Sequence, residues 1–450
     1  MSSEILHDLA VARPLQWPRI LPRQAQWLDP AELAALQRAR LQVVVARAAE
    51  TRYYGALLRE AGLDDSRRFE PGDLQRLPLL DRQTMAHHGL EAFLTVARDG
   101  LLSVQTSGST GTPGRFLRSW REEAGYSARW MRVYAAYGCG LRDPQINIAI
   151  ADKPERKGPI KLLRRVGLLP RVERLASDAP PAEILARVQE LDPPILTGYA
   201  GAIEALADHV LATGARIRPP RAVFCTAMEV TDRCLELAEQ AFRAPAVDVY
   251  VTNEFGVIAW SCPVRRGVMH LNDDALIVEV LGPDGAPVPA GVVGELVITS
   301  LGLTAMPLIR YRMGDMAARI PGRCECGRGL GLMTRVQGRT AHVIRRPDGA
   351  LITTPLITSL FGRVDAHDWV RRYQVREEPG QRLRFLLNVR RPPSATQRQA
   401  LTQSVEAGVG ADFRVSIEFV DEIPAAPSGK LQYLVPLARQ RRVEGDRLAS

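Results

Sequence analysis

Residues 106–114 carry an unusual density of groups that could hold an anion. They read TSGSTGTPG, so every side chain is a short hydroxyl, a hydrogen or a proline ring. Glycines let backbone N–H groups approach a phosphate closely, and hydroxyls add further donors. A flexible linker is the alternative, because Gly/Ser tracts behave as random coils. The run is short and stands between a strand-like segment and a helix-like one, which favours the phosphate cradle.

Four further motifs follow in order, and each contains a residue suited to nucleotide chemistry. They are YVTNEFG (250–256), YRMGD (311–315), GRT (338–340) and PSGK (427–430). A glutamate suits a hard cation, an aspartate can accept two hydrogen bonds at once, and a lysine can neutralise developing charge. Taken singly, Glu254 could be a solvated loop acid, Asp315 a turn residue and Lys430 a surface lysine. Five motifs in order at suitable spacing favour one site.

This constellation resembles the adenylate-forming superfamily of acyl-CoA synthetases and adenylation domains. Within it, the chain looks most like the phenylacetate-CoA ligase and coenzyme F390 synthetase-like branch, from about residue 100 to about residue 435. The resemblance implies a large N-terminal α/β domain of mixed sheets and helices, followed by a small mobile α+β domain. We place the boundary between residues 338 and 339, giving domains 1–338 and 339–450. It also implies ATP-dependent activation of a small carboxylic acid to acyl-AMP, with release of pyrophosphate.

The resemblance assigns a role to each motif residue. Lys430 and Glu254 would be catalytic, Glu254 as a ligand of Mg²⁺ and Lys430 as the cation between the carboxylate and the α-phosphate. Tyr250 would lie against adenine, Asp315 would accept hydrogen bonds from the ribose, and Tyr199 would line the acid pocket. The other residues expected to contact ATP are Thr106, Ser107, Gly108, Ser109, Thr110, Gly111, Thr112, Ala227, Met228, Glu229, Asn253 and Arg339.

The chain departs from the family's pattern at several positions. Asn253 replaces the usual threonine or serine before the motif glutamate, and Arg115 stands near the place of a lysine after the phosphate loop. Ala341 and His342 replace the acidic residues about which the small domain normally rotates. The resemblance implies CoA as the acyl acceptor, and the altered hinge region leaves an amine, a carrier-protein thiol or water open.

Three cysteines are left unexplained by these motifs and predict a structural zinc site. Cys262 is followed by His270, and Cys324 and Cys326 stand in the polar, glycine-rich segment GRCECGRG. Three thiolates and an imidazole form a sound tetrahedral zinc set. Buried, inert cysteines are the simpler alternative. Some members of the resembled branch carry zinc at similar places, which favours Cys262, His270, Cys324 and Cys326 as ligands.

The apolar periodicity predicts the elements that must position these residues. Residues 1–100 are expected to be helical, and residues 146–260 alternate strand-like and helix-like runs, which is typical of a largely parallel sheet. Such a sheet binds ligands at the carboxyl ends of its strands. Residues 275–300 predict an antiparallel strand pair. Beyond residue 349, RLRFLLNVRR, SATQRQALTQSVEAGV and FRVSIEFVDEI predict strand, helix and strand.

The composition excludes several classes of protein. The 450 residues are 46% hydrophobic and 24% charged, which disfavours wholesale disorder, and no apolar run is long enough to span a bilayer. We expect a cytoplasmic enzyme. A net charge of +9 raises nucleic-acid binding as a rival, but the arginines are scattered and no such motif is visible. A catalytically silent nucleotide-binding relative is the other rival, and a homodimer is left open.

Overall fold

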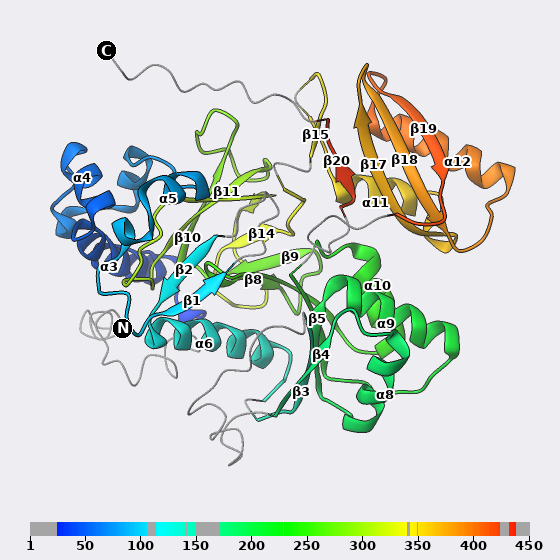
Figure 1. Ribbon diagram of the computed structural model, residues 1–450, viewed down its shortest axis with the longest axis horizontal. Helices are drawn as coiled ribbons and strands as arrows, with labels where there is room; N and C mark the ends of the chain where they lie inside the picture. The colour runs from blue at the N-terminus through cyan, green and yellow to red at the C-terminus, as the bar shows by residue number, and fades with distance from the viewer. Residues whose placement is uncertain are drawn as a thin grey trace. The chain divides into compact units, whose positions relative to one another are not determined.

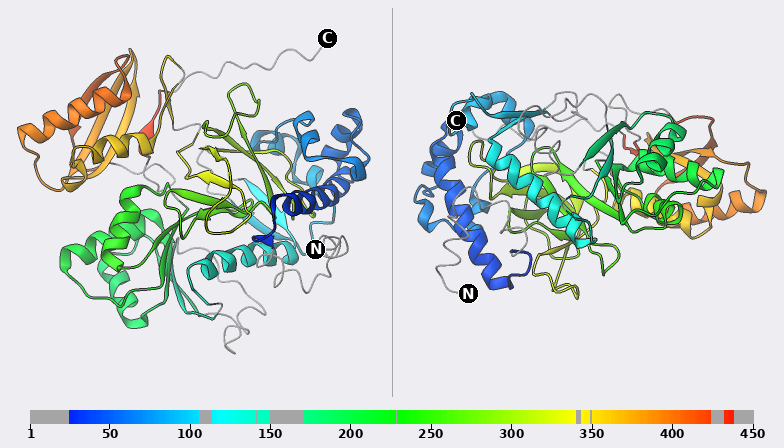
Figure 2. Two further views of the ribbon diagram at one scale, coloured as in Figure 1. Left: turned by 180° about the vertical axis from the view of Figure 1, so that it is seen from behind. Right: turned by 90° about the horizontal axis from the view of Figure 1, so that it is seen from below.

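The computed structural model describes residues 25–105, 114–140, 142–149, 171–227, 229–339, 343–348, 350–423 and 432–437. The chain divides into two compact units, Met1–Val336 and Gln337–Ser450, which are described separately below. The elements of both can be followed in Figures 1 and 2.

The first unit begins with helices that pack on a large apolar core. They are α3 (Pro30–Ala49), α4 (Arg52–Glu60) and α5 (Arg82–His88), with short 3₁₀ turns at Ser66–Arg68, Pro71–Arg76 and Leu90–Phe93. Helix α3 begins at a capping box, in which the Asp29 side chain accepts from the Glu32 N–H and the Glu32 side chain accepts from the Asp29 N–H. The buried side of α3 joins the same core as the three-stranded sheet described below.

A nine-stranded sheet forms the centre of this unit. Its order is β13-β14-β9-β8-β7-β6-β5-β3-β4. Strands β4, β3, β5, β6 and β7 run parallel, whereas the strands from β7 to β13 pair antiparallel. The strands are β3 (Gln145–Ala149), β4 (Val172–Ala176), β5 (Ile195–Tyr199), β6 (Ala222–Thr226), β7 (Ala246–Thr252), β8 (Gly256–Ser261), β9 (Val268–Leu271), β13 (Arg319–Ile320) and β14 (Leu332–Thr334).

Helices cover both faces of the parallel part of this sheet. Alternate residues of a strand face opposite sides, so Val223 and Cys225 of β6 pack with helices α8 (Pro181–Leu191), α9 (Ala200–Thr213) and α10 (Asp232–Phe242). Phe224 packs on the other side with α6 (Trp120–Ala136). Both faces are therefore apolar, as expected for buried parallel strands.

Two smaller sheets complete the unit. Strands β10 (Leu276–Leu281), β11 (Gly294–Ser300) and β12 (Tyr311–Ala317) form an antiparallel sheet, which confirms the predicted pair around residues 282–293. Strands β1 (Leu102–Gln105) and β2 (Arg115–Arg118) form a hairpin. The hydroxyl-rich run therefore joins two strands, not a strand and a helix as predicted. Helix α6 starts only after Ser119, whose side chain caps it.

The second unit is an α+β structure with its own core. Its four-stranded sheet has the order β19-β18-β17-β20, with β15 (Ile344–Arg345) and β16 (Leu351–Ile352) forming a separate pair. Its other elements are α11 (Thr354–Gly362), a 3₁₀ turn at Ala366–Asp368, β17 (Val370–Glu378), β18 (Arg382–Val389), α12 (Ala395–Val409), β19 (Arg414–Phe419) and β20 (Leu434–Val435). Helix α12 links the parallel strands β18 and β19, which confirms the predicted strand, helix and strand.

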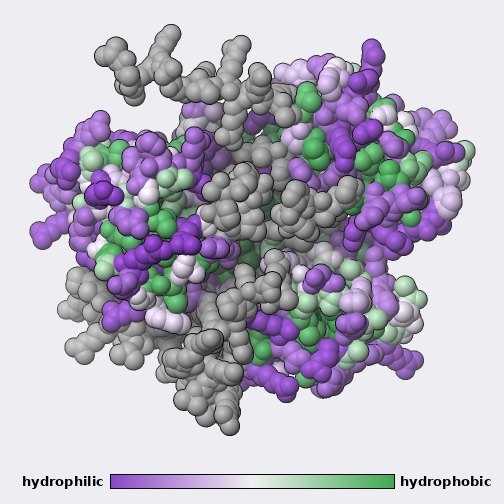
Figure 3. All heavy atoms as spheres, viewed as in Figure 1, coloured by the Kyte–Doolittle hydropathy of each residue, from purple (hydrophilic) through white to green (hydrophobic). Residues whose placement is uncertain are grey.

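No helix within the described ranges is both long and apolar enough to cross a membrane. Hydrophilic side chains predominate among the coloured atoms in Figure 3, and hydrophobic side chains form small separate groups there.

Candidate active site and metal centre

Two of the predicted nucleotide-binding residues meet directly. Tyr250 lies near the end of β7 and Asp315 lies on β12 of a different sheet. The Tyr250 hydroxyl donates a hydrogen bond to Oδ2 of Asp315 at 2.6 Å. An aromatic ring and a two-oxygen acceptor thus stand side by side, an arrangement suited to a base and its ribose.

Glu254 lies in the turn between β7 and β8 with only 4% of its surface exposed. Its Oε1 accepts from Nη2 of Arg82 at 3.2 Å, and Nε of Arg82 donates to the Tyr311 hydroxyl at 3.3 Å. The Glu254 carboxylate is therefore paired with a guanidinium in an almost fully buried position. Sequence reasoning missed Arg82, because nothing in its local pattern distinguishes it from the other arginines.

The turn that holds Glu254 is anchored to helix α6. The Tyr126 hydroxyl donates to the Glu254 carbonyl oxygen, and Arg129 donates to the Phe255 carbonyl oxygen. Gly256 follows with a φ of +69°, and a Cβ there would lie 2.9 Å from the Tyr126 ring. Only glycine fits this conformation beside the ring, so the sequence NEFG specifies the turn.

Asn253 connects the same turn to the β1–β2 hairpin. Its Nδ2 donates to the Gln105 carbonyl oxygen at 2.8 Å, and Arg118 of β2 donates to the Asn253 carbonyl oxygen at 2.9 Å. Gln105 is the last residue before the hydroxyl-rich run. That run, from Thr106 through Ser107, Gly108, Ser109, Thr110 and Gly111 to Thr112, lies outside the described residues. Gln105, the residue before the run, is therefore held beside Asn253, which precedes Glu254.

The carboxyl ends of the parallel strands bring other predicted residues to one edge. Tyr199 ends β5 and pairs with Thr226, the last residue of β6. Ala227 follows with a φ of +66°, which is rare for a residue with a side chain and often marks a functional site. Glu229 lies on the same loop, whereas Met228 and Lys430 lie outside the described residues. Arg339 belongs to the second unit and is half-buried.

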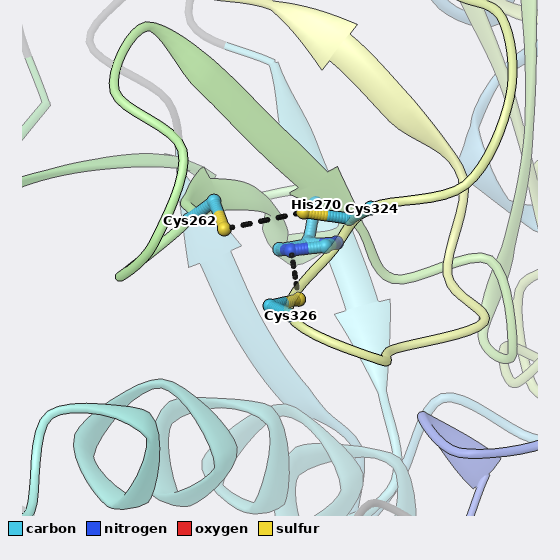
Figure 4. A group of neighbouring side chains, drawn as sticks. All are labelled: Cys262, His270, Cys324 and Cys326. Atoms are coloured by element: carbon cyan, nitrogen blue, oxygen red, sulfur yellow. Dashed lines mark hydrogen bonds between the residues drawn. The ribbon is translucent and has the colours of Figure 1, made fainter.

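The four predicted metal ligands converge in the first unit (Figure 4). Their ligand atoms all lie within 4.8 Å of one another: Cys262, His270, Cys324 and Cys326. Sγ of Cys262 is 3.5 Å from Sγ of Cys324, and Sγ of Cys326 is 3.2 Å from Nε2 of His270. Ligands of a tetrahedral zinc ion stand roughly 3.3–3.8 Å apart, given Zn–N and Zn–S bonds of about 2.0–2.3 Å. The donor set and its spacing fit this metal.

The elements that carry these ligands explain the convergence. Cys262 follows β8 and His270 lies on β9, whereas the other two cysteines lie in the loop between β13 and β14. Because β14 pairs with β9 and places Leu332 opposite His270, that loop closes over the imidazole. Segments more than 50 positions apart in the sequence therefore share one centre.

The surroundings favour ligand-competent forms of these side chains. Burial, aided by the positive charge of Arg328, lowers the pKa of His270 to about 4, so the imidazole is neutral at pH 7. Burial opposes ionisation of Cys326, but hydrogen bonds from Arg328 outweigh it and lower the pKa of that thiol. The N–H groups of Val264 and Arg265 point at Sγ of Cys262 at 3.4 and 3.3 Å. Such donors stabilise a thiolate.

In contrast, burial and the neighbouring thiols of Cys262 and Cys326 raise the pKa of Cys324 to about 12. A divalent metal ion at this cluster would favour the thiolate. Cys139, Cys225 and Cys234 are also buried but are not part of this group.

Comparisons with known proteins identify relatives of this chain and structures with the same fold. Residues 344–436 match the family model of the CapK C-terminal domain. The phenylacetate-coenzyme A ligase of Thermus thermophilus is 26% identical over 340 residues, covering 71% of this chain and 73% of the relative. Protein CapK of Staphylococcus aureus is 20% identical over 255 residues, covering 56% of this chain and 54% of the relative.

Among solved structures, a 2-hydroxyisobutyryl-CoA ligase in the postadenylation state superposes with a TM-score of 0.76 at 18% identity. The superposition covers 92% of this chain and 91% of that one. This likeness confirms the predicted fold class.

Proposed function

We propose, from its kinship with the phenylacetate-coenzyme A ligases and its adenylate-forming fold, that this chain activates a carboxylic acid with ATP and transfers the acyl group to a thiol. The observation that carries the proposal is the pairing of Tyr250 with Asp315 beside the turn of Glu254. Motifs 65 residues apart are brought to one place, where a nucleotide could be gripped by base and ribose. A surface acid or a turn residue would not need that pairing.

The first step makes one bond and breaks one. An oxygen of the substrate carboxylate attacks the α-phosphorus of ATP, and the bond to pyrophosphate breaks to give acyl-AMP. In the second step a thiolate attacks the acyl carbonyl, and AMP leaves. The protein contributes positioning and charge neutralisation. CoA is the acceptor favoured by the ligases that this chain resembles.

Each residue of the candidate active site is assigned one part in this reaction. Tyr250 would lie against the adenine, and Asp315 would accept from the ribose hydroxyls after its bond with the Tyr250 hydroxyl is released or shared. Glu254 would hold Mg²⁺, which neutralises phosphate charge when bound. Arg82 pairs with the almost fully buried Glu254 carboxylate. The hydroxyl-rich run would hold the β- and γ-phosphates, and Tyr199 would line the acid pocket.

We also propose that Cys262, His270, Cys324 and Cys326 hold a structural zinc ion. All four positions would be filled by protein, so the metal would have no open site for substrate. Its role would be to fasten the β13–β14 loop to β8 and β9.

The function is tested by acid-dependent exchange of radiolabelled pyrophosphate into ATP, screened over a library of aliphatic and aromatic carboxylic acids. Trapping of acyl-AMP with hydroxylamine then identifies the acid. Exchange with at least one acid, and thioester formation when CoA is added, is the expected result. ATP binding without exchange would instead indicate a silent relative, and exchange without thioester formation would indicate an amine or a carrier protein as acceptor.

A further inference from the structure

Arg335 makes three hydrogen bonds that the predicted motifs do not explain. Its Nε donates to Oδ2 of Asp248 at 3.0 Å, its Nη1 donates to a carboxylate oxygen of Asp232, and its Nη2 donates to the carbonyl oxygen of Val230. Each guanidinium nitrogen is thus engaged, and the side chain is only 15% exposed. This use of the full planar fork is one that lysine could not reproduce.

The three acceptors lie near the loop that carries Ala227 and Glu229, two of the predicted ATP contacts, which we call the adenine-side loop. Val230 and Asp232 follow directly after the loop of Ala227 and Glu229, and Asp232 is the first residue of α10. Asp248 lies two positions before Tyr250 on β7, so both side chains project from the same side of that strand. Arg335 therefore ties the adenine-side loop to the strand that carries the predicted adenine contact.

Arg335 also lies at the end of the first unit. It is followed by Val336, the last residue of the first unit, and by Arg339 four positions later. The segment that leads into the second unit is thus fixed, at its start, to the loop and strand that would hold the nucleotide.

The ion pair between Arg335 and Asp248 is largely buried. Burial raises the pKa of Asp248, while the Arg335 charge and its hydrogen bond oppose that rise. A carboxylate in such a position is costly unless it is paired and hydrogen-bonded. Through the single side chain of Arg335, the adenine-side loop, strand β7 and the segment that leads into the second unit are joined.

We infer that Arg335 is a positioning residue that couples nucleotide binding to the order of the linker between the two units. ATP binding at the adenine-side loop holds Val230 and Asp232 in place. These two residues hold the Arg335 guanidinium. The side chain of Arg335 in turn holds the start of the linker. The inference rests on the proposed function, because it takes the adenine-side loop to contact the ATP that the reaction consumes.

The test compares two arginines with matched surroundings. Arg132 is also buried and makes a two-pronged ion pair, with Asp274 at 2.7 and 2.8 Å, but it lies on α6, away from the linker. Arg335→Lys and Arg132→Lys both keep the charge and lose the fork. For each full-length variant, ATP affinity is measured by calorimetry, and hydrogen exchange is followed in a peptide covering residues 332–339 with and without ATP.

We expect ATP to slow exchange in the wild-type peptide 332–339. Arg335→Lys should weaken ATP binding about ten- to a hundredfold and abolish that protection at saturating ATP. Arg132→Lys should lower the melting temperature but leave ATP affinity and linker protection unchanged. Unchanged affinity and protection in Arg335→Lys, at a melting temperature lowered as in Arg132→Lys, would overturn the inference.

A milder variant keeps the test decisive if Arg335→Lys fails to fold. Asp232 is 64% exposed, so Asp232→Ala removes one acceptor of Arg335 with little loss of stability. It should reduce linker protection by ATP, and full protection would contradict the coupling. Absence of pyrophosphate exchange in the wild-type protein would refute the proposed reaction, whereas loss of coupling alone leaves that reaction intact.

Discussion

At the scale of single residues, the contact between Tyr250 and Asp315 is the most informative feature. Two side chains from different sheets meet at 2.6 Å, and the backbone next to one of them is fastened to α6 and to the β1–β2 hairpin. Glu254 of that turn forms an ion pair with Arg82 of helix α5, and the carboxylate is almost fully buried. The chemistry proposed for each follows from what these groups can donate, accept or neutralise.

Asp315→Ala should weaken ATP binding by about tenfold or more, because hydrogen bonds to a charged group contribute roughly 1.5–3 kcal/mol. The loss should be specific to the ribose. Calorimetry with ATP and with 2′,3′-dideoxy-ATP checks this, since the variant should bind the dideoxy nucleotide about as well as the wild type does. Equal ATP affinity in the variant and the wild type would show that the YRMGD motif has another role.

Lys430→Ala should slow formation of acyl-AMP by about 10²-fold or more, because one charge-stabilising contact in the transition state contributes roughly 3 kcal/mol. Folding should be unaffected, which a melting curve checks. The measurement is acid-dependent pyrophosphate exchange. A variant that exchanges at the wild-type rate would rule out this lysine as the catalytic cation, and Lys153→Ala would serve as the control for loss of a lysine elsewhere.

At the scale of elements, the Cys/His cluster joins two β-hairpins whose metal ligands lie more than 50 positions apart in the sequence. The β9–β14 pairing brings the loop of Cys324 and Cys326 onto His270. The loop between β13 and β14 has backbone hydrogen bonds from the Gly327 N–H to the Cys324 carbonyl oxygen and from the Gly329 N–H to the Gln26 carbonyl oxygen. A metal ion would add a link from this loop to β8 and β9.

Protein purified without added metal should contain about one zinc ion per chain. Cys324→Ser/Cys326→Ser should reduce that content toward zero and lower the melting temperature, because metal binding and local folding are coupled. Elemental analysis and thermal unfolding check both. Cys139→Ser, outside the cluster, should keep its zinc. Metal-free wild-type protein of full stability would contradict the assignment.

At the scale of the whole molecule, buried ion pairs link helices to sheets within the first unit. Arg132 of α6 pairs with Asp274 in the turn before β10, and both side chains are buried. Burial alone would raise the pKa of Asp274, but the adjacent Arg132 outweighs it and lowers that pKa. The pair thus makes the stability of the unit depend on pH.

The sign of this dependence follows from the lowered pKa of Asp274. Asp274 binds its proton less tightly in the folded state than in the unfolded state. The pair with Arg132 therefore stabilises the fold above the unfolded pKa of about 3.9, and this stabilisation is lost as pH falls below that value. Denaturant unfolding from pH 6 to pH 3 should show a shallower decline in Asp274→Asn than in the wild type. The exposed Asp99→Asn should match the wild type, and an unchanged slope in Asp274→Asn would refute the argument.

The sequence by itself determined the elements whose patterns are local, together with the family resemblance that the comparisons confirm. Apolar runs with clear turn residues predicted the pair β10–β11 and the order strand, helix and strand in the second unit. Hydrophobic periodicity depends on near neighbours, so it can be read without knowing the fold. The ordered motifs likewise led to the adenylate-forming fold.

Only the tertiary structure decided which distant groups meet. Arg82 reaches Glu254 and Arg335 reaches Asp248 because strands and helices far apart in sequence are packed together. The sequence predicted a helix-like segment directly after the hydroxyl-rich run, whereas Arg115–Arg118 forms a strand that pairs with β1. Helix α6 begins only at Trp120. Long-range pairing and the neutralisation of buried charge depend on the whole fold, so no local pattern could reveal them.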